Sequence, residues 1–238
     1  MSIPITTEQT PLEWLPFFLQ AADSQFPTGA YAHSLGLEES MRLGVVKNQE
    51  SLAKFLHTQL LPAEGAQELP YLRFAYEAAT ANDVATLLAL DAEVSAWKIP
   101  REIREGSAQL GGRRLLVLHR LSNAPLLAEF LEAIRDGKAA GHHLVIFGMQ
   151  GVVQGAPLMA TLHLHLYQSL AAMCAAAMKL MRIGQETCQQ VLRRACLEIS
   201  RVTNDSLLVR RDDAGWFNPL LDIAAMRHER ADERLFIS

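Results

Sequence analysis

The chain has 238 residues and a formal net charge of −4, and its residues are 50% hydrophobic and 20% charged. This length allows one large domain or two small ones. The weakly acidic balance gives no reason to expect nucleic acid or an anionic membrane as a partner. Soluble domains usually carry about 25% charged residues, so we expect part of the apolar excess to cover an interface.

The residue counts favour helices over strands. There are 37 Leu and 33 Ala, against 21 Val and Ile together. Leucine and alanine are strong helix formers, whereas β-branched residues favour strands. No low-complexity linker divides the chain. We therefore predict an all-α, single-domain helical bundle with a loose N-terminus and a C-terminal arm.

Cysteine usage and the absence of targeting signals favour a cytoplasmic protein. The three cysteines are odd in number and form no C-x-x-C motif, so neither a disulfide framework nor a zinc ribbon is expected. The first ten residues contain no secretory signal pattern. No uninterrupted apolar run reaches the roughly 18 residues that a membrane span requires.

The first third of the chain contains three predicted helices. Residues 1–10 are expected to form a flexible tail, and Thr10-Pro11-Leu12-Glu13 has the pattern of a helix start. A second helix is predicted from near His33 to Gly44, where glycine is a plausible C-cap. Asn48 is expected to cap a third helix that ends at Pro62.

Further helices are predicted along the rest of residues 11–217, which we assign to one domain. Gly148, Gly151 and Gly155 lie close to one helix face and are expected to let another backbone pack closely, within the chain rather than between copies. Residues 218–238 form the predicted arm. The predicted helices cover residues 66–79, 82–97, 101–120, 125–136, 157–182 and 185–201.

No catalytic signature is present. The sequence contains no P-loop, no G-x-G-x-x-G motif after a strand, no G-x-S-x-G elbow and no H-E-x-x-H motif. Gly111-Gly112-Arg113-Arg114 is the best stretch for cradling a phosphate, but its place in a helical pattern favours a solvated basic face. We therefore predict no catalytic residues and no enzymatic activity.

The histidines do not predict a metal site. His142 and His143 diverge by about 100° on a helix, and His163 and His165 by about 200°. On a strand the second pair would share a face, which leaves a metal site open there. His228 and Asp232 could share an ion at i, i+4 spacing, but a capping or salt-bridge role is the favoured interpretation. No metal ligands are assigned.

Five segments, in order along the chain, resemble the signatures of UreF-type urease accessory proteins. The first and last are the most specific. The segments are Phe26-Pro-Thr-Gly-Ala-Tyr-Ala-His-Ser-Leu-Gly-Leu-Glu-Glu39, Arg101-Glu-Ile-Arg104 through Gly111, His143 through Phe147-Gly148 to Val152, Leu180 through Ile183-Gly184-Gln185 with Gln190, and Leu221-Asp222-Ile223 through His228-Glu229 to Arg234-Leu235-Phe236-Ile237-Ser238.

This resemblance implies an all-α accessory protein with no intrinsic cofactor. Proteins of this family act with UreD (also called UreH) and the GTPase UreG to insert nickel into apo-urease. The resemblance therefore implies a non-enzymatic scaffold, expected to be a homodimer, in a complex that handles nickel while the partner GTPase binds GTP. Two alternatives stay open: direct modulation of GTP hydrolysis by UreG, and nickel binding through this chain's own histidines.

The resemblance also implies which residues contact partners. Tyr31 either anchors a contact or fills its own loop. Lys179 matches a basic position of the family, although Arg182 stands where the family usually has proline. Leu235 and Phe236 would be buried anchors. Arg193 is a further candidate for an exposed basic contact, with a solvated face formed with Arg194 as the alternative. The full set of candidate partner-binding residues is Tyr31, His33, Lys179, Arg193, His228, Glu229, Arg234, Leu235 and Phe236.

Overall fold

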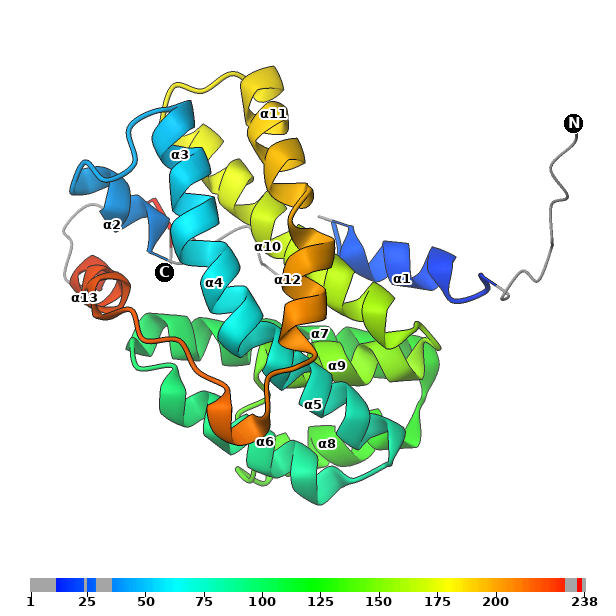
Figure 1. The fold of residues 1–238 in the computed structure, drawn as a ribbon. Coiled ribbons are helices and arrows are strands. Elements are labelled where there is room, and N and C mark those ends of the chain that lie inside the picture. Colours follow the sequence, from blue (N-terminus) through cyan, green and yellow to red (C-terminus); the bar gives the residue numbers. More distant parts are fainter. Residues whose placement is uncertain (1–11, 24, 29–35, 230–234, 237–238) are drawn as a thin grey trace, which may run out of the picture.

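The computed structural model describes residues 12–23, 25–28, 36–229 and 235–236, and all regular structure within these ranges is helical (Figure 1). The all-α prediction is therefore confirmed. The α-helices are α1 (Leu15–Ala22), α2 (Leu37–Arg42), α3 (Gln49–Phe55), α4 (Leu61–Ala63), α5 (Leu69–Thr80), α6 (Val84–Trp97), α7 (Arg101–Ser122), α8 (Pro125–Arg135), α9 (His143–Val153), α10 (Leu158–Leu180), α11 (Gln185–Cys196), α12 (Ile199–Ser206) and α13 (Pro219–His228).

Several predicted helix boundaries are confirmed by their capping geometry. The Asn48 side chain accepts a hydrogen bond from the Ser51 amide at 3.0 Å, and the Ser51 hydroxyl accepts one from the Asn48 amide. This reciprocal capping box fixes the start of α3. Gly44 has a φ of +71°, a left-handed conformation that suits glycine after the end of α2.

The helix that begins at α3 does not stop at Pro62, contrary to the sequence prediction. It continues through two π-helical turns, η2 (Leu56–Leu60) and η3 (Glu64–Glu68), into α5 (Figure 1). The Leu61 amide, just before Pro62, bonds the Leu56 carbonyl five residues back, and Leu69 repeats this pattern before Pro70. Because these wider turns accommodate the ring and the missing amide of proline, the helix passes both positions.

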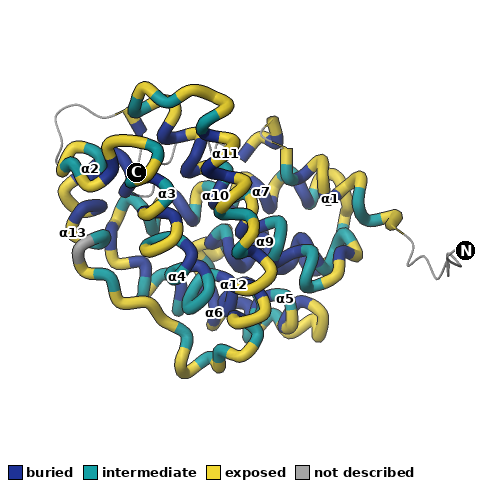
Figure 2. Tube along the Cα trace, turned by 45° about the horizontal axis from the view of Figure 1, so that its top comes forward, coloured by how far each residue is buried: buried dark blue, intermediate teal, exposed yellow. Residues whose placement is uncertain are grey.

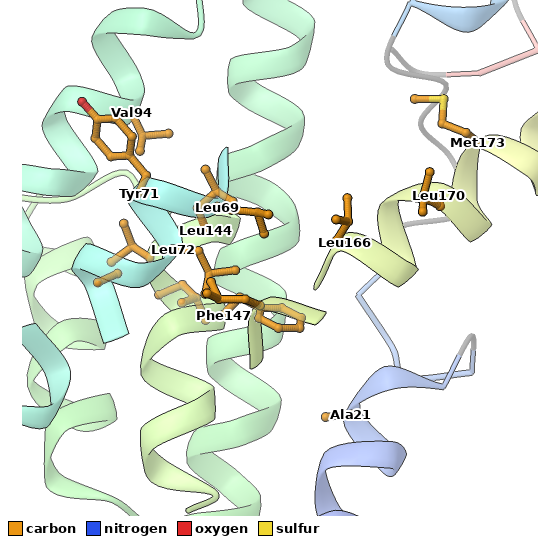
Figure 3. Close-up of a cluster of buried hydrophobic side chains, with 14 of the residues drawn as sticks. Ala21, Leu69, Tyr71, Leu72, Val94, Leu144, Phe147, Leu166, Leu170 and Met173 are labelled. Carbon is orange, nitrogen blue, oxygen red and sulfur yellow. The ribbon is translucent and has the colours of Figure 1, made fainter. Parts of the chain in front are cut away.

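The core is built around α9, which packs between α5 and α7. A Cβ atom on Gly148 would lie 2.8 Å from the Leu72 carbonyl oxygen, so only glycine allows α5 and α9 to approach this closely. Figure 3 shows Leu144 and Phe147 of α9 among the buried side chains of α5. The predicted close approach of another backbone is confirmed at Gly148. Gly151 instead faces the Thr161 side chain, and a Cβ atom on Gly155 would meet nothing within 4 Å, so the prediction was wrong at Gly155.

Arg114 is part of this core, whereas the sequence favoured a solvated basic face. It is only 3% exposed, and its guanidinium donates to the Gln150 side chain at 2.6 Å and to the Ala21 carbonyl at 3.1 Å. The rings of Phe26 and Phe147 lie close to the same guanidinium. Burial lowers the pKa of Arg114 to about 9. The amide, carbonyl and ring contacts explain how an arginine is accommodated here.

The two ends of the molecule are formed by different segments. In both Figures 1 and 2, α1 lies at one end, while α2, α13 and the C-terminus lie at the other. The long α10 runs between them, in agreement with the predicted helix over 157–182. Among the described helices, none combines the length and the apolar character needed to cross a bilayer.

Candidate partner-binding site at the C-terminal arm

Three segments that are far apart in the sequence meet at the end of α13. Glu38 lies on α2, Arg101 and Glu102 begin α7, and His228 and Glu229 end α13. We call these five residues the arm clamp. They come from the first, second and last of the segments that resemble the UreF signatures, so the clamp gives those three segments a common physical role.

His228 is the centre of the arm clamp. It is 1% exposed, its Nε2 atom lies 3.0 Å from Glu38 Oε2, and its Nδ1 atom lies 2.9 Å from Glu102 Oε2. A carboxylate only accepts hydrogen bonds, so both ring nitrogens donate when the imidazole is protonated. His228 thus bridges the carboxylates of Glu38 and Glu102 and joins α13 to α2 and α7.

Glu38 also holds the backbone of the arm beyond α13. Its carboxylate accepts hydrogen bonds from the Leu235 amide at 2.9 Å and from the Phe236 amide at 3.1 Å. Burial by itself would raise the pKa of Glu38. The hydrogen bonds from Leu235, His228 and Phe236 outweigh burial and hold that pKa below its usual value.

A more exposed ion pair supports the outer side of the clamp. Arg101 Nε donates to Glu229 Oε1 at 3.0 Å, and the two side chains are 58% and 31% exposed. Such a solvated pair contributes little to stability. The pair links the end of α13 to the start of α7.

The last two described residues point in different directions. Phe236 is buried, and Lys179 Nζ lies 5.3 Å from the centre of its ring, whereas Leu235 is 62% exposed. Phe236 therefore anchors the arm to its own chain. Leu235 remains available on the surface beside it.

The structure brings five of the nine predicted partner-binding residues to this place: Lys179, His228, Glu229, Leu235 and Phe236. Arg193 lies elsewhere, exposed on α11. Tyr31, His33 and Arg234 lie outside the described residues. Sequence reasoning missed Glu38, Arg101 and Glu102, although all three belong to the quoted motifs. One signal in the sequence could have identified them. All three are charged residues inside the motifs, and no neighbouring residue in the sequence explains why a charge is needed there.

The histidines considered as metal ligands have other partners. His142 is buried between the hydroxyls of Ser95 and Ser107, and burial lowers its pKa to about 4. His165 Nε2 lies 3.3 Å from Glu64 on η3.

His163 lies on the helix α10 with His165, which excludes the shared strand face, and it contacts the Met159 carbonyl. Asp232 lies outside the described residues. Across the part of the chain that the structure describes, no three or more His, Cys, Asp or Glu side chains are placed to hold a metal ion.

A second exposed surface lies at the opposite end of the molecule. A groove of about 490 Å³ runs between α1 and the C-terminal ends of α7 and α9. Phe17 and Leu121 line it and are 61% and 59% exposed. Helix α1 buries Phe18 and Ala21 on its other side, so it is apolar on both sides. A helix that is apolar on both sides is normally buried on both sides by other protein segments.

The described residues thus form a helical protein with an anchored C-terminal segment at one end and an exposed apolar groove at the other. The family model described as UreF matches residues 46–196. A urease accessory protein UreF from Arthrobacter sp. (strain FB24) is 33% identical over 92% of this chain and 95% of its own length.

Two further relatives carry the same name. Those of Actinobacillus pleuropneumoniae and Lachnoclostridium phytofermentans are both 32% identical over 92% of this chain, covering 97% and 96% of their own lengths. The chain belongs to the UreF family of urease accessory proteins.

Proposed function

We propose that this chain is a non-enzymatic scaffold that binds UreD and the GTPase UreG and takes part with them in inserting nickel into apo-urease. Its family supports a role in urease maturation. The observation that carries the finer proposal is the arm clamp, which holds the C-terminal arm in place while Leu235 stays exposed.

The clamp favours binding by ordering the arm in advance. A free C-terminal segment loses conformational entropy when a partner orders it, and this loss weakens binding. Two backbone hydrogen bonds to Glu38 and the burial of Phe236 already restrict the arm. The exposed Leu235 then offers apolar area to UreD at a lower entropic cost.

Arg234 provides the test of this proposal, because it directly precedes Leu235 and has five donors for carboxylates or carbonyls of a partner. We expect Arg234→Ala to leave the melting temperature unchanged and to lower urease activation in cells. Arg113→Ala, at an exposed arginine on α7 away from the groove residues, is the control. Full urease activity with Arg234→Ala would contradict the proposal that the arm binds a partner.

The groove at α1 supports the homodimer that we propose as part of this function. A second copy related by a two-fold axis would place its own Phe17 in the groove, which makes the contact self-complementary. Glu13 at the groove and the exposed Arg120 nearby on α7 have opposite charges. A two-fold pairing would set the acidic part of one copy against the basic part of the other.

Direct modulation of UreG is the second candidate function. Arg193 is exposed and makes no ion pair with any other described residue, so it is free to reach a partner. GTP turnover by UreG with and without this chain separates modulation from tethering. Calorimetry with Ni²⁺ on the isolated chain tests the metallochaperone alternative.

We place the protein in the cytoplasm, a proposal that its three free thiols support.

A further inference from the structure

The C-terminal end of α1 is held through its main-chain carbonyls. The last carbonyls of a helix have no donor within that helix, so they need donors from elsewhere. The Ala21 carbonyl accepts a hydrogen bond from the Arg114 guanidinium of α7 at 3.1 Å. The Ala22 carbonyl accepts one from the Gln168 side chain of α10 at 2.8 Å. Two other helices therefore cap the end of α1.

A third hydrogen bond to α1 comes through two glutamine side chains. Arg114 donates to the Gln150 side-chain oxygen at 2.6 Å. The Gln150 amide donates to Gln154 at 3.0 Å, and the Gln154 amide donates to the Phe17 carbonyl at 3.3 Å. We call the side chains of Arg114, Gln150 and Gln154 the α1 relay. It links α7 to α1 along the C-terminal end of α9.

The chemistry of its two ends fixes the direction of the α1 relay. A guanidinium only donates hydrogen bonds, and a main-chain carbonyl only accepts them. Gln150 must therefore turn its oxygen toward Arg114 and its NH₂ group toward Gln154. Gln154 must in turn direct its NH₂ group at the Phe17 carbonyl. A change that reverses either amide would break the contact with α1.

Arg114 suits this place because α1 offers it partial negative charge. A cation is favourable at the C-terminal end of a helix, where unpaired carbonyls converge. The guanidinium also lies 4.9 Å from the centre of the Phe147 ring and 5.4 Å from that of Phe26. Because α1 supplies one of the acceptors, displacement of α1 would leave this buried charge less well compensated.

The three hydrogen bonds also fix how α1 is turned about its axis. Helix α1 buries Phe18 and Ala21 and leaves Phe17 61% exposed at the groove. Successive residues differ by about 100° around a helix. A rotation of α1 would therefore move the Phe17 ring away from the groove, and donors on α7, α10 and the end of α9 oppose that rotation.

We infer that the α1 relay positions α1 for self-association, with Arg114 as the positioning residue that sets the direction of both glutamine amides. This inference rests on the proposed homodimer. Arg114 and Gln150 are buried, and other residues line the groove. Both side chains therefore act through α1 and Phe17, without touching the second copy.

Gln150→Glu tests the relay, because replacing Arg114 itself would disturb the core. The new carboxylate accepts from Arg114 but cannot donate to Gln154. The Gln154 amide then turns to donate to this carboxylate and presents its own oxygen to the Phe17 carbonyl. Sedimentation equilibrium should show the Kd of self-association rising about fivefold. The melting temperature should not fall, since Arg114 gains a counter-ion.

Two further variants make this result specific. Gln189→Glu adds the same charge at an exposed position on α11 and should leave the Kd unchanged. In a Phe17→Ala background, Gln150→Glu should change the Kd by less than about twofold, because the relay acts through this ring.

Equal Kd values for Gln150→Glu and Gln189→Glu would overturn the relay and leave the homodimer intact. A fivefold rise that persists in the Phe17→Ala background would overturn it as well, and so would a melting temperature that falls together with the affinity. A wild-type chain that stays monomeric would instead remove the proposed homodimer, and the relay would then have no surface to prepare.

Discussion

The two ends of the molecule differ in the kind of contact that their side chains make. At the α13 end, buried charges and hydrogen bonds attach a segment of the chain to itself, with His228 between Glu38 and Glu102. At the α1 end, Phe17 and Leu121 remain exposed around a groove, and neighbouring side chains donate to the main-chain carbonyls of α1, Arg114 to Ala21 and Gln154 to Phe17.

This difference underlies the separate roles that we propose for the two ends. Buried ionic contacts have strict geometry and contribute to specificity more clearly than to stability, so the α13 end presents one defined conformation of the arm. An apolar contact at the α1 end does not require exact hydrogen-bond geometry. Such a contact gains free energy in proportion to the apolar area that it buries. The first suits recognition of a particular partner, and the second suits association with a second copy.

Removing Glu38 should have the largest effect on the α13 end. Glu38→Ala deletes one counter-ion of the buried His228 and the acceptor for two arm amides. Breaking such a buried pair costs about 3 kcal/mol. Amide hydrogen exchange should therefore speed up about 100-fold at Leu235 and Phe236, whereas Glu50→Ala on the exposed face of α3 should change nothing. Unchanged exchange would mean that the clamp does not hold the arm.

A charged residue in the groove should weaken self-association through the α1 end. Phe17→Asp should weaken self-association by about 2 kcal/mol, a Kd increase of about 30-fold, because the substitution places a carboxylate in an apolar contact. Sedimentation equilibrium measures this change. Leu208→Asp is the control, since Leu208 is 83% exposed and lies far along the chain from the groove. If both variants associate equally, α1 is not the dimer surface.

As the pH falls, the hydrogen bonds that hold the arm at the α13 end should weaken before self-association through the α1 end does. The pKa of Glu38 is lowered in the folded protein from its usual 4.5. Its contribution is therefore complete above that value and is lost as pH falls through the lower, folded pKa. Intrinsic amide exchange itself slows as pH falls, so the readout is the protection factor, the ratio of intrinsic to observed exchange. The protection factors of Leu235 and Phe236 should fall at acid pH in the wild type and change less in Glu38→Gln. A self-association constant that changes first would reverse this order.

Local features of the fold were predictable from the sequence because their causes are local. The Asn48 cap depends on a residue three positions away, and the helical course of residues 157–182 follows from composition and length. Pro62 was misjudged because its penalty was treated as absolute. The π-helical turn before it supplies an alternative hydrogen-bond pattern that no residue-by-residue rule contains.

The site itself was only partly predictable. His228 was recognised as a salt-bridge candidate, but its partners Glu38 and Glu102 lie 190 and 126 residues away. Such pairs depend on how α2, α7 and α13 pack, which helical periodicity does not specify. The burial of Arg114 was missed for the same reason, since its acceptors come from α1 and α9.

The central claim is that the arm clamp prepares the C-terminal arm for its partner. Calorimetric titration of purified UreD into the wild-type chain and into Glu38→Gln tests it most directly, because this substitution keeps the size of the side chain and removes its charge. The account predicts at least a tenfold weaker affinity for Glu38→Gln, measured well below the melting temperature of both chains. Equal affinities for the two chains would contradict it.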